Sequence, residues 1–229
     1  MSYLERPATA AKSMLSRVYG WMTAGLLVTA ATAYYVAHTP AIIKTLYTQP
    51  FLILALVLVQ LGLVMFLSFR IQRMSFAAAV ASFIAYSLLT GLTLSGIFLV
   101  YTQQSIAITF VVCAGMFLAM ALYGFFTNAD LSGMGSFLFM GLIGLMIALF
   151  VNMFLKSSQL DYVISAFGVV VFALLTAYDV QRIKVMSQQM QSAGVSAPNI
   201  AIYGALTLYL DFVNLFIYLL RFLGQSKDR

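Results

Sequence analysis

Two aspartates in strongly apolar stretches, Asp179 and Asp211, are the residues of this sequence that point most directly to chemistry. If these stretches cross a lipid bilayer, a carboxylate at mid-depth costs at least about 2.5 kcal/mol on insertion scales, so it is expected to face protein or water. Two carboxyl groups in contact away from water cannot both ionise cheaply, and we expect them to share one proton. Loss of that proton would leave an acidic site for a hard cation such as Ca²⁺, which suggests a proton-controlled cation path.

The spacing of the two aspartates allows them to meet. Residue 195, midway between them, lies in the run Ser-Ala-Gly-Val-Ser-Ala-Pro at residues 192–198, which is rich in helix breakers. If the helices on either side form an antiparallel hairpin that turns there, equal numbers of residues bring both carboxyl groups to the same level. The alternative is a purely structural role, either a hydrogen bond between helices or an ion pair of Asp211 with a buried arginine.

Polar and small residues share the helical faces of the two aspartates. Thr176 lies one turn before Asp179. Steps of three and four residues from Asp211 reach Gly204, Thr207, Asn214, Tyr218 and Arg221. We therefore expect these side chains to line a polar interior or a pore beside the aspartates.

Two residues of an earlier apolar stretch are further candidates. Gln60 lies in the middle of that stretch and could line a polar interior, although a single amide more often joins two helices. Arg70 ends the stretch and is the best candidate for a counter-charge to the aspartates, but it is equally explained as a positive charge on the cytoplasmic side.

Composition determines the setting of these residues. The 229-residue chain is 63% hydrophobic and only 8% charged, whereas an ordinary soluble domain has about 25% charged residues. Residues 74–129 carry no formal charge at all, and about 20 apolar residues cross the hydrocarbon core as a helix. The sequence therefore predicts an all-α membrane protein.

We expect seven transmembrane helices in a single domain at residues 18–224, after a polar N-terminal segment at 1–17 and before a short basic tail at 225–229. The connection after the first span, which holds His38, Pro40, Lys44 and Pro50, is expected to be a loop. A helical extension of the sixth span to residue 186 is also allowed. The expected spans are residues 18–37, 51–69, 75–101, 105–126, 134–155, 162–178 and 200–220.

The basic residues indicate how the chain crosses the membrane. Most of the lysines and arginines outside the tail fall on the N-terminal side of the expected spans, which favours a cytoplasmic N-terminus. Seven full spans then place the C-terminus outside, whereas a re-entrant last segment would return the basic tail to the cytoplasm. The basic clusters flank apolar spans and are not interleaved with aromatics along one face, so we interpret them as topology signals and expect no nucleic-acid partner.

Few other residues suggest chemistry. The sequence contains no Ser-His-Asp set, HExxH motif, phosphate-binding loop or cysteine pair, so we expect neither an enzyme nor a cofactor. His38 has no second histidine or cysteine near it, which makes a zinc site improbable. The single cysteine, Cys113, is expected to be a small buried residue.

Three motifs carry a resemblance to a known family. The runs Leu-Leu-Thr-Ala-Tyr-Asp-Val-Gln at 174–181, Gly-Ala-Leu-Thr-Leu-Tyr-Leu-Asp-Phe-Val-Asn-Leu-Phe at 204–216 and Leu-Leu-Arg-Phe-Leu-Gly at 219–224 closely resemble the signature of the Bax inhibitor-1 family, in its bacterial branch. The likeness extends over nearly the whole chain, including residues 19–23 and 90–96.

This resemblance implies a bundle in which the last helix is central and two groups of three helices surround it. It also implies that Asp179 and Asp211 match the family's paired aspartates, the proposed pH sensor of a Ca²⁺ leak. Arg70 loosely matches an arginine that exchanges contacts with them. Many relatives have glutamate where this sequence has Gln60, which removes one possible cation ligand here.

Three functions are compatible with these observations. The first is a pH-sensitive Ca²⁺-permeable leak channel in a bacterial inner membrane, gated by Asp179 and Asp211, which would also be tentative Ca²⁺ ligands. The second is a non-conducting regulator of a membrane-bound quality-control protease, as some bacterial relatives are implicated in such a role. The third is a proton-coupled transporter of small solutes. The expected partners are accordingly the lipid bilayer, Ca²⁺ and protons, and in the second case other membrane proteins.

Overall fold

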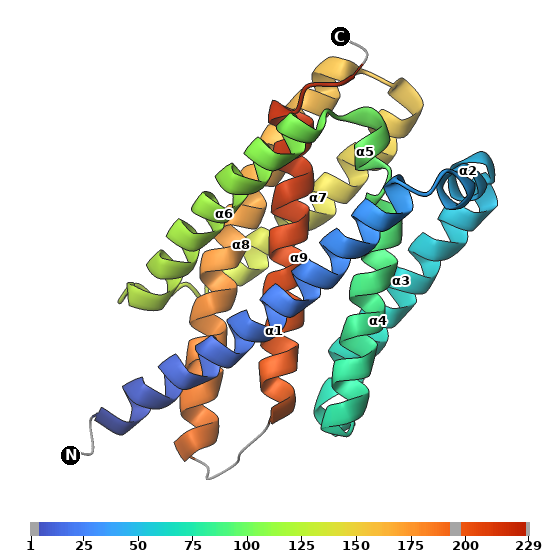
Figure 1. Cartoon of the computed structure of the whole chain (residues 1–229). Coiled ribbons are helices and arrows are strands. Elements are labelled where there is room, and N and C mark those ends of the chain that lie inside the picture. The colour runs from blue at the N-terminus through green and yellow to red at the C-terminus, as the bar shows by residue number, and fades with distance from the viewer. Residues whose placement is uncertain (1–4, 193–197, 228–229) are drawn as a thin grey trace. The chain divides into compact units, whose positions relative to one another are not determined.

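The computed structural model describes residues 5–192 and 198–227, and these residues form helices and no strand (Figure 1). The helices belong to two compact units, which share the long helix near the C-terminus. Unit 1 comprises residues 5–101, 187–192 and 198–209. Unit 2 comprises residues 102–186 and 210–227.

Unit 1 contains the helices of the N-terminal half of the chain, together with the first part of α9 (Pro198–Leu223) and the last residues of α8 (Ser158–Ser192). Its own elements are α1 (Glu5–Ala37), α2 (Pro40–Thr48), α3 (Pro50–Arg70), the 3-10 turn η1 (Ile71–Arg73), α4 (Phe76–Leu94) and α5 (Ile97–Val100). In this unit α1 packs on α4, where Gly91 lies against the backbone oxygen of Thr29, and a side chain in place of Gly91 would collide with α1.

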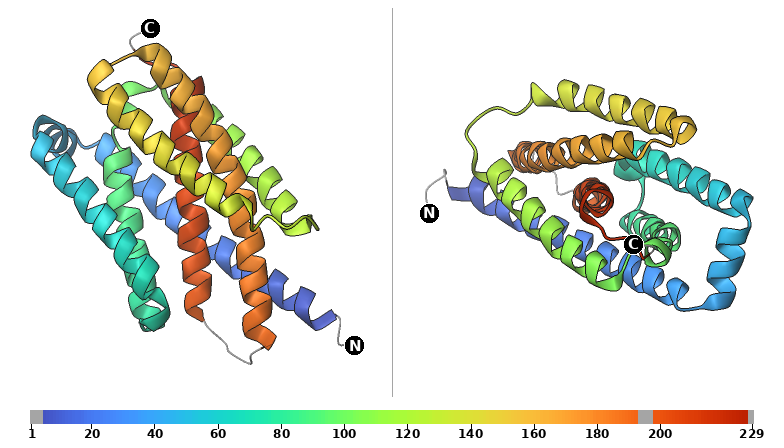
Figure 2. Two further views of the ribbon diagram at one scale, coloured as in Figure 1. Left: turned by 180° about the vertical axis from the view of Figure 1, so that it is seen from behind. Right: turned by 90° about the horizontal axis from the view of Figure 1, so that it is seen from above.

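Unit 2 contains α6 (Gln103–Phe126), α7 (Met134–Leu155), most of α8 and the second part of α9. Within it α7 lies along α8, where Gly141 faces Val171 (Figure 2). The side chain of Thr102 caps the start of α6 by accepting a hydrogen bond from the backbone N–H of Ser105. Lys156 ends α7 in a left-handed conformation, with φ of 50°.

Among the described residues, six stretches are helical, long and apolar enough to cross a membrane, and they correspond to the second to seventh predicted spans. Residues 13–37 of α1 and the short α2 together would make a seventh, broken by a bend of 92°. The prediction of an all-α, multi-span membrane protein is thereby confirmed. The predicted helical extension of the sixth span is also present, because α8 continues to Ser192.

One detail of the predicted layout is wrong. The segment from Pro40 to Thr48, expected to be a loop, is the helix α2, because Pro40 stands at the first helical turn, where a proline needs no hydrogen-bonding N–H. Leu46 of α2 is buried and Tyr47 donates a hydrogen bond of 3.0 Å to the backbone oxygen of Thr93. The helix that contains the first predicted span starts at Glu5, so it also includes most of the polar N-terminal segment.

The spans differ in how far they are buried. Only 6% of the apolar stretch of α3 and 11% of that of α7 is buried, whereas the figures are 61% for α8 and 72% for α9. Apolar side chains that the protein leaves exposed along a membrane span face lipid, which can serve as their solvent. The helix pair that carries the two aspartates is therefore the one most removed from lipid, and α9, which the resemblance places at the centre, takes part in both units.

Candidate functional site

The candidate site lies in unit 2, between α8 and the second part of α9. These two helices run antiparallel, as the sequence spacing requires (Figure 1). The ring of Phe172 on α8 stacks on the ring of Tyr218 on α9, with centroids 5.6 Å apart and planes inclined by 23°. Gly168 makes room for this contact, because a Cβ atom there would lie 2.6 Å from Cγ of Tyr218. The predicted turn at residues 192–198 lies largely outside the described residues.

Asp179 and Asp211 meet in this helix pair. Their exposed fractions are 7% and 5%, and the two carboxyl groups are close enough to interact with each other. The Oδ2 atom of Asp211 is buried and has no hydrogen-bond partner in the described part of the chain. Since an ionised carboxylate cannot donate, a hydrogen bond between the two groups requires a proton on one of them.

A positive charge acts on the pair. Arg182, one turn beyond Asp179 on α8, attracts the Asp179 carboxylate electrostatically. The described residues contain no group of three or more His, Cys, Asp or Glu side chains that could hold a metal ion. The arrangement is thus two carboxyl groups facing each other, with a positive charge acting on one of them.

The polar neighbours predicted on the same faces are present but are engaged within their own helices. Thr176 donates a hydrogen bond of 2.8 Å to the backbone oxygen of Phe172, and Asn214 donates one of 2.8 Å to that of Leu210. Tyr218 is buried against Phe172. Of the predicted stripe, therefore, Thr176, Asn214 and Tyr218 lie in the same unit as the aspartates.

Three other predicted residues belong to unit 1. Gln60 donates a hydrogen bond of 3.2 Å to Oγ1 of Thr93, so it joins α3 to α4, as the more ordinary interpretation of a lone amide expects. Thr207 bonds to the backbone oxygen of Tyr203 in its own helix. Arg70 is exposed at the end of α3, and its exchange of contacts with the aspartates stays a prediction.

Contacts that the sequence did not reveal position α8 next to the aspartate pair. Gly124 of α6 lies directly against the backbone of Ala177, so a side chain at residue 124 would push the two helices apart. Gln181 donates a hydrogen bond of 2.8 Å to the backbone oxygen of Ala129 and accepts one of 2.9 Å from the N–H of Leu131. The sequence offered one indication of this contact: Gln181 is a polar residue in a largely apolar helix, two positions after Asp179.

Asp130, in the connection between α6 and α7, is an exposed acid and so differs from the buried pair. Hydrogen bonds from the side chain and backbone of Ser132 lower the pKa of the fully exposed Asp130. Asp130 therefore stays ionised under ordinary conditions and takes no part in the pairing.

Comparison with known proteins identifies the family. The family described as "Inhibitor of apoptosis-promoting Bax1" matches residues 11–228. The chain is 49% identical to Inner membrane protein YbhL of Escherichia coli K12, over 97% of this chain and 95% of that protein. It is 47% identical to a protein of Borreliella burgdorferi over 93% and 92% of the two chains, and 42% identical to protein RP147 of Rickettsia prowazekii over 93% and 89%. The chain belongs to the Bax inhibitor-1 family.

Proposed function

We propose that this Bax inhibitor-1 family protein is a pH-sensitive, Ca²⁺-permeable leak channel of a bacterial inner membrane, with Asp179 and Asp211 as its proton switch. The observation that carries the proposal is the buried Oδ2 atom of Asp211, which has no hydrogen-bond partner in the described chain and belongs to a carboxyl group that faces a second one. Buried polar atoms are almost always paired, and an unpaired one at a helix contact is a candidate for a functional group.

A proton on the pair closes the contact between α8 and α9. With the proton present, one carboxyl group donates to the other and the two helices are held together at this level. Without it, two negative charges in contact repel, and for a separation of about 4 Å at an effective dielectric constant of about 20 the repulsion is about 4 kcal/mol. That repulsion is enough to shift a closed–open equilibrium about a thousandfold, so alkaline conditions open the contact.

The same two carboxylates suit a passing Ca²⁺ ion better than a stored one. Calcium takes six to eight oxygen ligands in a tight site. Two carboxylates attract the ion and replace only part of its water, and conduction requires binding that is weak enough for the ion to leave. The absence of a third acidic ligand among the described residues supports passage and not storage.

The orientation and chemistry of the protein follow the same proposal. The distribution of lysine and arginine places the N-terminus in the cytoplasm. The name of the Escherichia coli relative supports the inner membrane as the location. The protein acts without enzymatic turnover and without a cofactor, and its ligands are protons and Ca²⁺.

Purified protein in liposomes that contain a Ca²⁺ dye tests the proposal. Wild-type vesicles are expected to take up Ca²⁺ faster as the pH is raised, while Asp179→Asn and Asp211→Asn vesicles lose most of the pH dependence, because an amide donates a hydrogen bond at every pH. Asp130→Asn is the matched control, since this acid of the same unit is fully exposed, and it is expected to behave as wild type.

The alternatives appear as distinct outcomes of the same assay. Wild-type vesicles that stay silent at every pH would overturn the channel, and copurification with a membrane protease would then favour the regulator. Proton uptake that requires an added solute would favour the transporter.

A further inference from the structure

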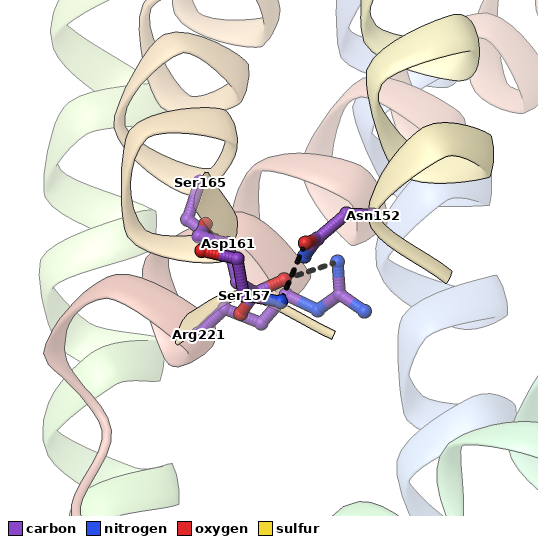
Figure 3. A network of polar contacts seen from close by, with 5 residues as sticks. All are labelled: Asn152, Ser157, Asp161, Ser165 and Arg221. Atoms are coloured by element: carbon purple, nitrogen blue, oxygen red, sulfur yellow. Dashed lines mark hydrogen bonds and ion pairs between the residues drawn. The ribbon is translucent and has the colours of Figure 1, made fainter. Parts of the chain in front are cut away.

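We propose that the contact between α8 and α9 contains a second gate, in series with the aspartate pair and separate from it. This distal gate consists of Gly168, Phe172 and Tyr218. It is held closed by the ion pair of Asp161 and Arg221, which Figure 3 shows. All five residues belong to unit 2. The inference rests on the proposed channel function and adds a second barrier to it.

The stacked rings lie at a level of their own. Phe172 comes two helical turns before Asp179, and Tyr218 comes two turns after Asp211, so each ring is about 10 Å along its helix from the aspartate on that helix. Equal steps on two antiparallel helices keep the two pairs opposite each other. An ion that follows the contact between α8 and α9 must therefore pass both pairs, one after the other.

The rings form an apolar barrier. Phe172 and Tyr218 have exposed fractions of only 8% and 7%, and they stack nearly parallel over Gly168. The close approach of Tyr218 to Gly168 leaves no room for a hydrated ion between the ring and α8. Hydrophobic constrictions of this kind gate channels by excluding water, so the stack must part before an ion passes.

An ion pair one turn further along α9 holds the rings in place. Nη1 of Arg221 lies 3.7 Å from Oδ1 of Asp161, and the two side chains are 38% and 40% exposed. Figure 3 shows the setting of this pair: Asn152 accepts a hydrogen bond of 3.0 Å from the N–H of Ser157 and so fixes the connection before α8. Half-exposed ion pairs add little to stability, so this one is suited to a contact that opens and closes.

A second aromatic contact runs beside the ion pair. Tyr162 and Phe222, the next residue on each helix, stack with centroids 4.6 Å apart. The end of α9 is also tied to α6, because the N–H of Gln225 donates a hydrogen bond of 2.9 Å to Oγ of Ser105. The distal end of the helix pair thus has its own set of contacts, and it can open without any change at the aspartates.

The first test is Ca²⁺ flux into liposomes at several pH values. Tyr218→Ala and Phe172→Ala are expected to raise the flux at alkaline pH about two- to tenfold, the effect of losing a stacked ring pair, without shifting the pH midpoint. At acid pH these vesicles stay closed, because the aspartate pair is in series. Phe117→Ala is the matched control: this ring is buried in the same unit but contacts Phe212 from α6, and it is expected to conduct as wild type.

The second test uses the exposed ion pair and leaves the core intact. Asp161→Arg and Arg221→Asp are each expected to raise flux at alkaline pH, and the double exchange restores it to within about twofold of wild type, since the attraction is re-formed with reversed signs. In a Cys113→Ala background, Asp161→Cys with Arg221→Cys is joined by a short bis-methanethiosulfonate. Flux at alkaline pH is expected to fall, and to return when a reductant cleaves the link.

The outcomes separate the two proposals. Wild-type flux that depends on pH, together with ring, exchange and cross-linked variants that match wild type, would overturn the distal gate and leave the aspartate switch standing. Flux that rises at every pH in Tyr218→Ala would also overturn it, because a series gate cannot open the channel at acid pH. Silent wild-type vesicles with conducting Tyr218→Ala vesicles would support the distal gate and remove the pH switch. Silence in all vesicles would overturn both.

Discussion

Tyr209 in unit 1 and Asp211 in unit 2 are only two positions apart on α9, and they show how differently the two units accommodate a buried polar group. The hydroxyl of Tyr209 lies 2.6 Å from Oγ1 of Thr29, which in turn donates a hydrogen bond of 2.9 Å to the backbone oxygen of Ser87. Asp211 is buried to a similar degree, yet its Oδ2 atom has no partner in the described chain. One buried group joins three helices, and the other has an oxygen atom without a partner in the described chain.

The hydrogen-bonded cluster at Tyr209 suits a structural role, whereas the carboxyl pair suits the proposed switch. A neutral, fully bonded cluster keeps the same hydrogen bonds at every ordinary pH, so it stabilises unit 1 unconditionally. In the proposed switch the carboxyl pair changes with pH, so it would stabilise unit 2 only while it holds a proton. Both units also rely on close helix contacts at glycine, Gly91 in unit 1 and Gly124 in unit 2.

The largest loss of stability is expected for Gly124→Leu, which disrupts the contact between α6 and α8. The side chain would meet the backbone of Ala177, and overpacking of this kind is expected to cost about 3 kcal/mol or more. Thermal unfolding in detergent measures the loss. Gly115→Leu on the same helix is the control, because a Cβ atom there meets nothing within 4 Å, and it is expected to be nearly neutral. Equal losses in both variants would mean that α6 does not fix α8.

Asp211→Asn is expected to have the next largest effect and to remove the contrast between the units. At alkaline pH the amide still donates a hydrogen bond to Asp179, whereas the wild-type pair has lost its proton, so the variant should be more stable by about 1–3 kcal/mol. At acid pH the wild-type pair holds its proton and the difference disappears. Unfolding curves recorded across pH test this, and a constant difference would contradict the shared proton.

Tyr209→Phe should have a smaller effect that does not depend on pH. The variant loses the hydrogen bond to Thr29 but keeps the ring, which packs edge-on against Phe83 and Tyr86. A cost of about 0.5–1.5 kcal/mol is expected at every pH, as for one buried hydrogen bond. The same unfolding curves across pH measure this cost. If the change in stability in Tyr209→Phe varied with pH as that in Asp211→Asn does, the proposed difference between the two units would be contradicted.

The smallest effect is expected for Gln60→Leu. Its single hydrogen bond to Thr93 joins two helices, and such bonds in membranes contribute about 0.6 kcal/mol on average. Calcium flux should be unchanged, since the amide is engaged in unit 1. A double-mutant cycle with Thr93→Val measures the bond itself, and a large loss of flux in Gln60→Leu would instead assign Gln60 to the ion route.

The sequence predicted the positions of most helices because hydropathy and helical length are local properties. The stretch 134–155 coincides with α7, and residues 105–126 lie within α6. It was wrong about α2, since Pro40 and Pro50 signal a break in a helix as readily as the start of one. The same symmetry about residue 195 that predicted the turn also predicted that Asp179 and Asp211 would meet.

The rest of the site depends on how each helix is rotated and shifted relative to its neighbours, which the sequence of one helix does not determine. The sequence by itself determined an all-α membrane protein, its apolar spans, and two acids that an antiparallel pair can bring together. Only the tertiary structure decided that Gln60 bonds to Thr93, that Gly124 admits the backbone of Ala177, and that the Oδ2 atom of Asp211 has no hydrogen-bond partner in the described chain. The reason is physical: periodicity fixes which residues share a face, but the partner of that face is set by packing over the whole unit.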